Sequence, residues 1–225
     1  MASANLLSLL HLSSPSLPIG AFAYSQGLES AVELGWVKDP DSLQQWLEQM
    51  MTHGLSHVDI PLLKRLYISW QQQDLNAVSY WQDVVMANRE SAELLKEETQ
   101  LGTTFSRLIH SLDLAPEGGF AIPGERLPGY LSMYAYAAQK LQIPLADALA
   151  GWLWSWLENQ VVVACKTVPL GQTAAQKILL KLHGAIQTCV SEGEAVSDDE
   201  IGMTLPAFAM VSAWHEQQYS RLFRS

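Results

Sequence analysis

Apolar residues recur at the spacing of an α-helix along almost the whole chain, and this periodicity limits the fold more than any other feature. One segment begins with Asp39 as N-cap and Pro40 at the first helical position. Its apolar stripe then consists of Leu43, Trp46, Leu47, Met50, Met51 and Gly54. No stretch alternates apolar and polar residues for long enough to make a strand, and the short run at 161–163 lies in a helical context. The sequence therefore predicts an all-α fold.

The same spacing predicts further helices over residues 61–70, 74–85, 91–112, 130–141, 145–167, 170–190 and 206–223. Asp74 is the expected N-cap of the helix over 74–85. Between two of them, residues 113–129 contain three Pro and four Gly, which predicts a loop between two helical halves. Both halves carry broad apolar stripes, and 48% of the 225 residues are hydrophobic. We therefore expect residues 1–225 to form a single compact domain of about eight to ten helices.

The charge balance limits the possible partners. The formal net charge is −10, from 13 Lys and Arg against 23 Asp and Glu. Nucleic acid and anionic membranes both reward basic patches, so neither is expected as the main partner. The only candidate for a membrane span, residues 151–168, has Glu158, Asn159 and Gln160 at its middle, where lipid would penalise them. The start shows no export signal, which predicts a cytoplasmic protein.

Recognisable catalytic and cofactor-binding motifs are missing, so no catalytic or cofactor-binding residue is predicted. His53 and His57 are four residues apart and Asp59 follows, which makes them candidate metal ligands. In the competing interpretation, both rings pack beside the apolar stripe and hydrogen-bond a neighbour. Four acidic residues lie close together with Arg89 and Lys96 among them, namely Glu90, Glu93, Glu97 and Glu98. We interpret these residues as a solvated helix face.

Residues 13–29 are too apolar for a linker and too broken for a helix. Pro15 and Pro18 forbid continuous helix, while Gly20 and Gly27 permit backbone angles that other residues avoid. The segment also carries bulky apolar side chains, namely Ile19, Phe22 and Tyr24. We expect this loop to pack against its own core or against another protein.

Two later segments also stand out. At residues 159–172 a core helix stops and another begins, either as a functional surface or as an ordinary joint between helices. The tail, about residues 215–225, ends in YSRLFRS and combines aromatic, aliphatic and guanidinium groups. Such groups are typical of interface hot spots, whereas chain ends are usually polar. We therefore favour partner binding over a tail folded onto its own core.

Four segments together resemble the urease accessory protein UreF family. They are LSSPSLPIGAFAYSQGLESAVELGW at 12–36, ANRESAELLKEETQLG at 87–102, NQVVVACKTVPLGQTAAQKIL at 159–179, and the terminal YSRLFRS. They follow the order of the family and span nearly the whole chain. Residues 113–129 carry no diagnostic match, so nothing is carried over to that loop.

The resemblance implies a non-catalytic, all-α scaffold or chaperone that forms a homodimer. Such a scaffold joins UreD (UreH in some species) and the GTPase UreG, and couples the GTPase cycle to nickel insertion into the urease apoprotein. It implies no resident cofactor, only transient passage of nickel.

The resemblance also implies roles for particular residues. The tail would dock on UreD through Tyr219, Ser220, Arg221, Leu222, Phe223, Arg224 and Ser225. A surface near the GTPase would include Lys166, Pro169, Leu170, Gly171 and Gln172. The early loop would be either a dimer contact or a wall of the nickel route, through Pro18, Gly20, Phe22, Tyr24 and Gln26.

The competing hypothesis is an all-α enzyme with an apolar pocket between helices. It rests on the eight Trp and seven Tyr and on the polar step at 158–160 inside a core helix. This hypothesis predicts a closed cavity lined by Glu158, Tyr134 or Tyr136.

Overall fold

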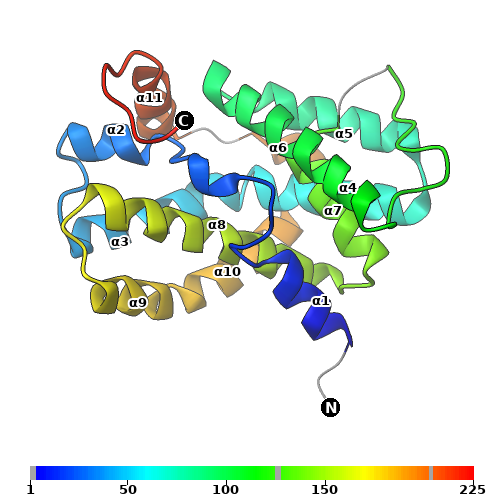
Figure 1. Cartoon of the computed structure of the whole chain (residues 1–225), viewed down its shortest axis with the longest axis horizontal. Helices are drawn as coiled ribbons and strands as arrows, with labels where there is room; N and C mark the ends of the chain where they lie inside the picture. Colours follow the sequence, from blue (N-terminus) through cyan, green and yellow to red (C-terminus); the bar gives the residue numbers. More distant parts are fainter. Residues whose placement is uncertain (1–3, 125–127, 203–204) are drawn as a thin grey trace.

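The computed structural model describes residues 4–124, 128–202 and 205–225, and its helices pack into one compact domain (Figure 1). No strand occurs within these ranges. The predicted all-α class is confirmed. Residues 125–127 of the predicted central loop lie outside the described residues.

The N-terminal half contains α1 (Ala4–Leu12), η1 (Ala21–Ala23), α2 (Leu28–Glu33), α3 (Pro40–Gln49), η2 (Met50–Leu55), α4 (Asp59–Gln72), α5 (Leu75–Ala87) and α6 (Ala92–Ser111). Predicted N-caps act as expected: Asp39 accepts a hydrogen bond from the Ser42 N–H, and Asp74 accepts one from the Ala77 N–H. The predicted stripe from Leu43 continues past α3 into η2, which is π-helical.

The C-terminal half contains α7 (Tyr130–Lys140), α8 (Leu145–Thr167), α9 (Gln172–Lys181), α10 (His183–Ala195), η3 (Asp198–Glu200) and α11 (Pro206–His215). The prediction of a single helix over 170–190 is wrong, because the helix is interrupted at Leu182 and a second helix, α10, begins at His183. The break turns α10 onto α4, where Gly193 allows close approach. A Cβ at Gly193 would lie 2.5 Å from Ile60 Cγ2.

The last helix is also shorter than predicted: α11 ends at His215, not near Phe223. His215 is fully buried, and the N–H groups of Gln217 and Gln218 bond back to Trp214 and His215 as a turn. The residues that follow form an irregular tail with turns and bends.

The two halves are interleaved, not side by side. Helix α8 is mostly buried and packs against α1, α2, α4, α7, α9 and α10, so it contacts elements of both halves. Helix α7 packs on α4 and α6. Gly102 of α6 permits this last contact, since a Cβ there would lie 2.1 Å from the Pro128 carbonyl oxygen.

None of the helices in the described ranges has the length and apolar character that a bilayer crossing requires. Cys165 is half-buried and Cys189 is buried, and both are free thiols. Burial raises the pKa of the Cys189 thiol to about 12, which makes it unreactive.

Candidate functional site

The early loop and the tail, distant in sequence, lie side by side. The Ser25 N–H donates to the Ser225 carbonyl oxygen at 2.8 Å, and the Arg224 N–H donates to the Ala23 carbonyl oxygen at 2.8 Å. In Figure 1 the C terminus accordingly lies beside α2 and α11. We call residues 18–26 and 219–225 together the loop–tail junction. The structure thus brings two sequence-predicted segments into one site.

The tail is held by a buried carboxylate of α2. Glu29 accepts hydrogen bonds from the N–H groups of Leu222 at 2.7 Å and Phe223 at 3.1 Å. Phe223 and Ser225 are 6% and 1% exposed. The preference for a partner-binding tail over one folded onto its own core is therefore corrected for these two residues. Glu29 thus provides the hydrogen-bond acceptor for two main-chain N–H groups of the tail, and the tail packs on its own subunit.

Other tail side chains remain outside. Tyr219 is fully exposed and Leu222 is 71% exposed. The loop adds Phe22, which is 63% exposed. The loop–tail junction therefore has a buried inner side and an apolar outer side.

The base of the tail carries a charged cluster. Both nitrogens of the buried His215 ring face carboxylates, with Nδ1 2.6 Å from Glu93 and Nε2 3.2 Å from Glu29. Arg221 also pairs with Glu93. Glu93 is consequently not part of a solvated face, contrary to the sequence-based interpretation.

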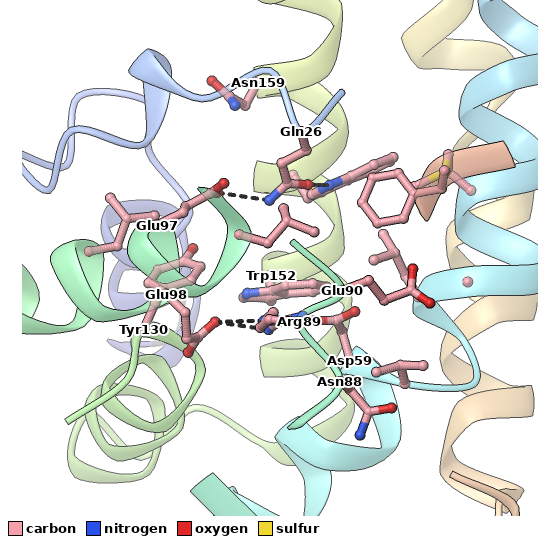
Figure 2. A pocket seen from close by; sticks show the side chains of 18 of the residues that line it. Gln26, Asp59, Asn88, Arg89, Glu90, Glu97, Glu98, Tyr130, Trp152 and Asn159 are labelled. Atoms are coloured by element: carbon pink, nitrogen blue, oxygen red, sulfur yellow. Dashed lines mark hydrogen bonds and ion pairs between the residues drawn. The ribbon is translucent and has the colours of Figure 1, made fainter. Parts of the chain in front are cut away.

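Behind the loop–tail junction lies a cavity of about 120 Å³ (Figure 2). Gln26 of the loop reaches into its wall, where its Nε2 donates to Glu97 at 2.8 Å and its Oε1 accepts from the Trp156 indole at 2.7 Å. Glu97 also accepts a hydrogen bond from the Ser225 hydroxyl at 2.9 Å. One carboxylate therefore contacts the loop and the tail while lining the cavity.

Charge in the cavity wall is unevenly compensated. Arg89 bonds both Asp59 and Glu98 at 2.8 Å, and Glu98 also accepts the Leu131 N–H at 2.8 Å. Burial lowers the pKa of Arg89, but the two carboxylates outweigh this and raise it above its usual value. Glu97 has only neutral hydrogen-bond partners. Burial raises the pKa of Glu97 to about 7, despite the opposing bonds from Gln26 and Ser225.

Glu97 and Glu98 correct the predicted solvated face of α6, since both are buried. The sequence did contain a signal. Both residues lie at helical spacing between Leu94 and Leu101 of the apolar stripe, so they share its inward direction. The signal was missed because unpaired acids are rarely buried, and the pairing of Glu98 with Arg89 is visible only in three dimensions.

Some of the other predicted site residues lie at the loop–tail junction, and others lie outside it. Tyr24 is buried and its hydroxyl donates to Gln100 at 2.8 Å, while Gly20 has φ +86°. Asn159 of α8 donates to the Tyr24 carbonyl oxygen at 3.1 Å, and the Lys166 ammonium lies 5.5 Å from the Phe223 ring centroid. Helix α8 thus supports the loop–tail junction. In the turn that follows α8, Leu170 is buried and belongs to the packed joint between the two helices. The exposed residues of this turn are Pro169, Gly171 and Gln172. Pro18 is exposed.

The candidate metal ligands are not brought together. His53 is exposed, the His57 Nδ1 lies 2.8 Å from the Ser56 hydroxyl, and Asp59 is paired with Arg89. Within the described ranges, no group of at least three His, Cys, Asp or Glu side chains is placed to hold a metal ion.

The residues suggested for an enzyme pocket lie elsewhere too. The Tyr134 hydroxyl donates to the Ala148 carbonyl oxygen at 3.1 Å, and the Tyr136 hydroxyl donates to that of Leu114 at 2.7 Å. Neither tyrosine lines the cavity, and neither does Glu158. The pocket predicted by the enzyme hypothesis is therefore not this one.

Comparison with known proteins finds similarity over nearly the whole chain. A family model described as UreF matches residues 37–183. The urease accessory protein UreF of Pseudoalteromonas translucida is 48% identical over 223 residues, which cover 98% of this chain and 94% of that protein. The corresponding protein of Chromohalobacter salexigens is 50% identical over 220 residues, with the same coverage. That of Hahella chejuensis is 40% identical over 225 residues, covering 98% of each chain.

Proposed function

Because this chain belongs to the UreF family of urease accessory proteins, we propose that it is a non-catalytic scaffold that joins UreD (UreH) and the GTPase UreG. In this proposal the assembly delivers nickel to the urease apoprotein and couples the GTPase cycle to metal transfer. The scaffold works in the cytoplasm, as a homodimer. The observation that carries the proposal is the loop–tail junction, which displays apolar side chains on a charged, acidic chain.

The exposed side of the loop–tail junction supports a docking role. Phe22, Tyr219 and Leu222 are 63%, 105% and 71% exposed, although each is large and apolar or aromatic. Aromatic and aliphatic anchors surrounded by polar groups are the usual centre of a protein interface. UreD docks here, through the outer side of the tail, while the buried Phe223 keeps the tail in position.

The cavity bears on the two roles left open for the loop. Gln26 and Ala21 of the loop line a cavity. Its described lining holds one guanidinium, that of Arg89, against four carboxyl groups: Asp59, Glu90, Glu97 and Glu98. This excess of carboxylates makes the cavity attractive to a divalent cation in transit. We therefore favour the loop as a wall of the nickel route, with nickel as cargo and not as a resident ligand.

The test uses exposed residues whose loss leaves the fold intact. Replacing Tyr219 and Leu222 together by Ser should weaken binding to purified UreD by more than about tenfold, because two interface anchors are lost. The melting temperature should stay unchanged. A matched control is Leu10→Ser, since Leu10 of α1 is 59% exposed and lies in another segment.

Urease activation completes the test. In cells that lack the native protein, the double variant should activate urease poorly and the Leu10→Ser control normally. Undiminished binding to UreD by the double variant would contradict the docking proposal, and turnover of a substrate by the purified chain would contradict the non-catalytic role.

A further inference from the structure

A second, open hollow lies where the loop, α6 and the tail meet. This groove has a volume of about 440 Å³, and it is lined by Tyr24 of the loop, by residues 99–107 of α6 and by Arg224 of the tail. It adjoins the cavity, since Leu101 lines both. The function proposed above assigns no ligand to it.

The groove is basic on an otherwise acidic protein. Among the described residues, its lining includes Arg107 and Arg224 but no Asp or Glu, although the chain carries a formal charge of −10. Both arginines are exposed, and neither forms an ion pair within the part of the chain that the structure describes. Arg224 interacts with the Tyr24 side chain, but neither guanidinium is paired with a carboxylate of the described chain, so both can accept one from a ligand.

Helix α6 sorts its charges in the same direction. Its acidic residues Glu93, Glu97 and Glu98 point inward and are hydrogen-bonded to other elements. Its cations Lys96 and Arg107 are exposed, and helical spacing from 96 through 100 and 103 to 107 places them on one face. The outward face of α6 is thus positive along the groove.

The polar groups between the two arginines indicate which kind of anion fits. The Thr103 and Thr104 hydroxyls donate to main-chain carbonyl oxygens one turn earlier, at 2.8 and 2.9 Å. The Tyr24 hydroxyl donates to Gln100. The protons of the two threonine hydroxyls are occupied, so these groups offer a ligand only lone pairs, which suit the N–H groups of a peptide main chain. A compact phosphate instead needs many donors around it.

From this arrangement we propose that the groove binds an extended, carboxylate-rich segment of a partner protein. Acidic side chains of the segment reach Arg107 and Arg224, and its main-chain N–H groups meet the threonine oxygens. Lys96 extends the positive face at one end. Recognition of this kind sets association rate and specificity and weakens as salt screens the charges.

The experiment measures binding of a labelled peptide of alternating Glu and Ala to the full chain by fluorescence anisotropy. Arg107→Glu should weaken binding by about tenfold or more, which corresponds to about 1.4 kcal/mol. Lys177→Glu is the matched control, because Lys177 is an exposed cation of α9 and the charge change is the same. Arg224→Gln is a second variant. The substitution removes the guanidinium but keeps the hydrogen bond from the main-chain N–H of residue 224 to the Ala23 carbonyl oxygen. Added salt should weaken binding to the unmodified chain.

Three results would overturn the proposal. The first is equal affinity of the Arg107→Glu and Lys177→Glu variants for the peptide. The second is binding of an alternating Ser and Ala peptide as tightly as the acidic one. The third is displacement of the peptide by inorganic phosphate at similar concentration, which would identify a phosphate site. The assay contains no UreD, UreG or nickel, so its failure would leave the proposed scaffold function standing.

Discussion

Glu97 is the residue at which the loop, the tail and the cavity meet, and its proton should govern stability. Its pKa is raised from 4.5 to about 7 in the folded chain, mainly by burial. The folded state therefore holds a proton that the unfolded state has released between these two pH values. The free energy of unfolding should fall as pH rises through this window, by up to about 3 kcal/mol.

The variant Glu97→Gln keeps the shape but cannot titrate, so it should lack this part of the pH dependence. Urea unfolding of the two proteins from below pH 4.5 to above pH 7 would show the difference. Because other carboxylates titrate identically in both, their contribution cancels in the comparison. An equal slope for the two proteins would mean that Glu97 does not carry the proton.

At the scale of residues, the sequence predicted caps better than charges. Asp39 and Asp74 were recognised because a cap is decided within four residues of chain. Glu97 and His215 were not recognised, because their burial depends on partners that lie 71 to 186 positions away. Local patterns carry no information about such pairs.

The tail is docked on its own subunit, and Glu29 makes several of the contacts that hold it. Glu29 accepts two of its main-chain N–H groups and also binds His215. Replacing Glu29 by Ala should release the tail, because a charged acceptor of several buried hydrogen bonds contributes on the order of 2 kcal/mol or more. Trypsin should then cut after Arg221 and Arg224 about tenfold faster.

Glu33→Ala is the control for this release, since Glu33 belongs to the same helix α2 but is exposed. Hydrogen exchange at residues 222–225 would give an independent measure of tail docking. Unchanged cleavage in the Glu29→Ala variant would show that the other contacts of the tail, such as Phe223 packing and the bonds of Ser225, hold it without Glu29.

At the scale of elements, long helices were predictable and their ends were not. The stripes from α3 to α8 appear in the sequence because each faces one core. The break at Leu182 and the end of α11 at His215 were missed, since both are fixed by packing onto other elements. The short helices α1 and α2 were missed because the irregular segment between them hides their periodicity.

The whole molecule should unfold as one unit in spite of its central loop. Helix α8 packs on elements of both halves, and α7 packs on α4 and α6, so neither half keeps a separate core. Urea unfolding followed by tryptophan fluorescence and by circular dichroism should give coincident transitions. The eight Trp are divided equally between the parts of the chain before and after the central loop, so their fluorescence follows both halves. Two separated transitions would show that the halves are independent.

The shared carboxylate of Glu97 also has a consequence for regulation. A free-energy coupling acts equally in both directions. A change in the electric field inside the cavity therefore alters the strength of the hydrogen bond between Glu97 and Ser225. Displacement of the tail in turn alters the pKa of Glu97. The affinity of a partner that binds the tail would therefore depend on the charges present in the cavity.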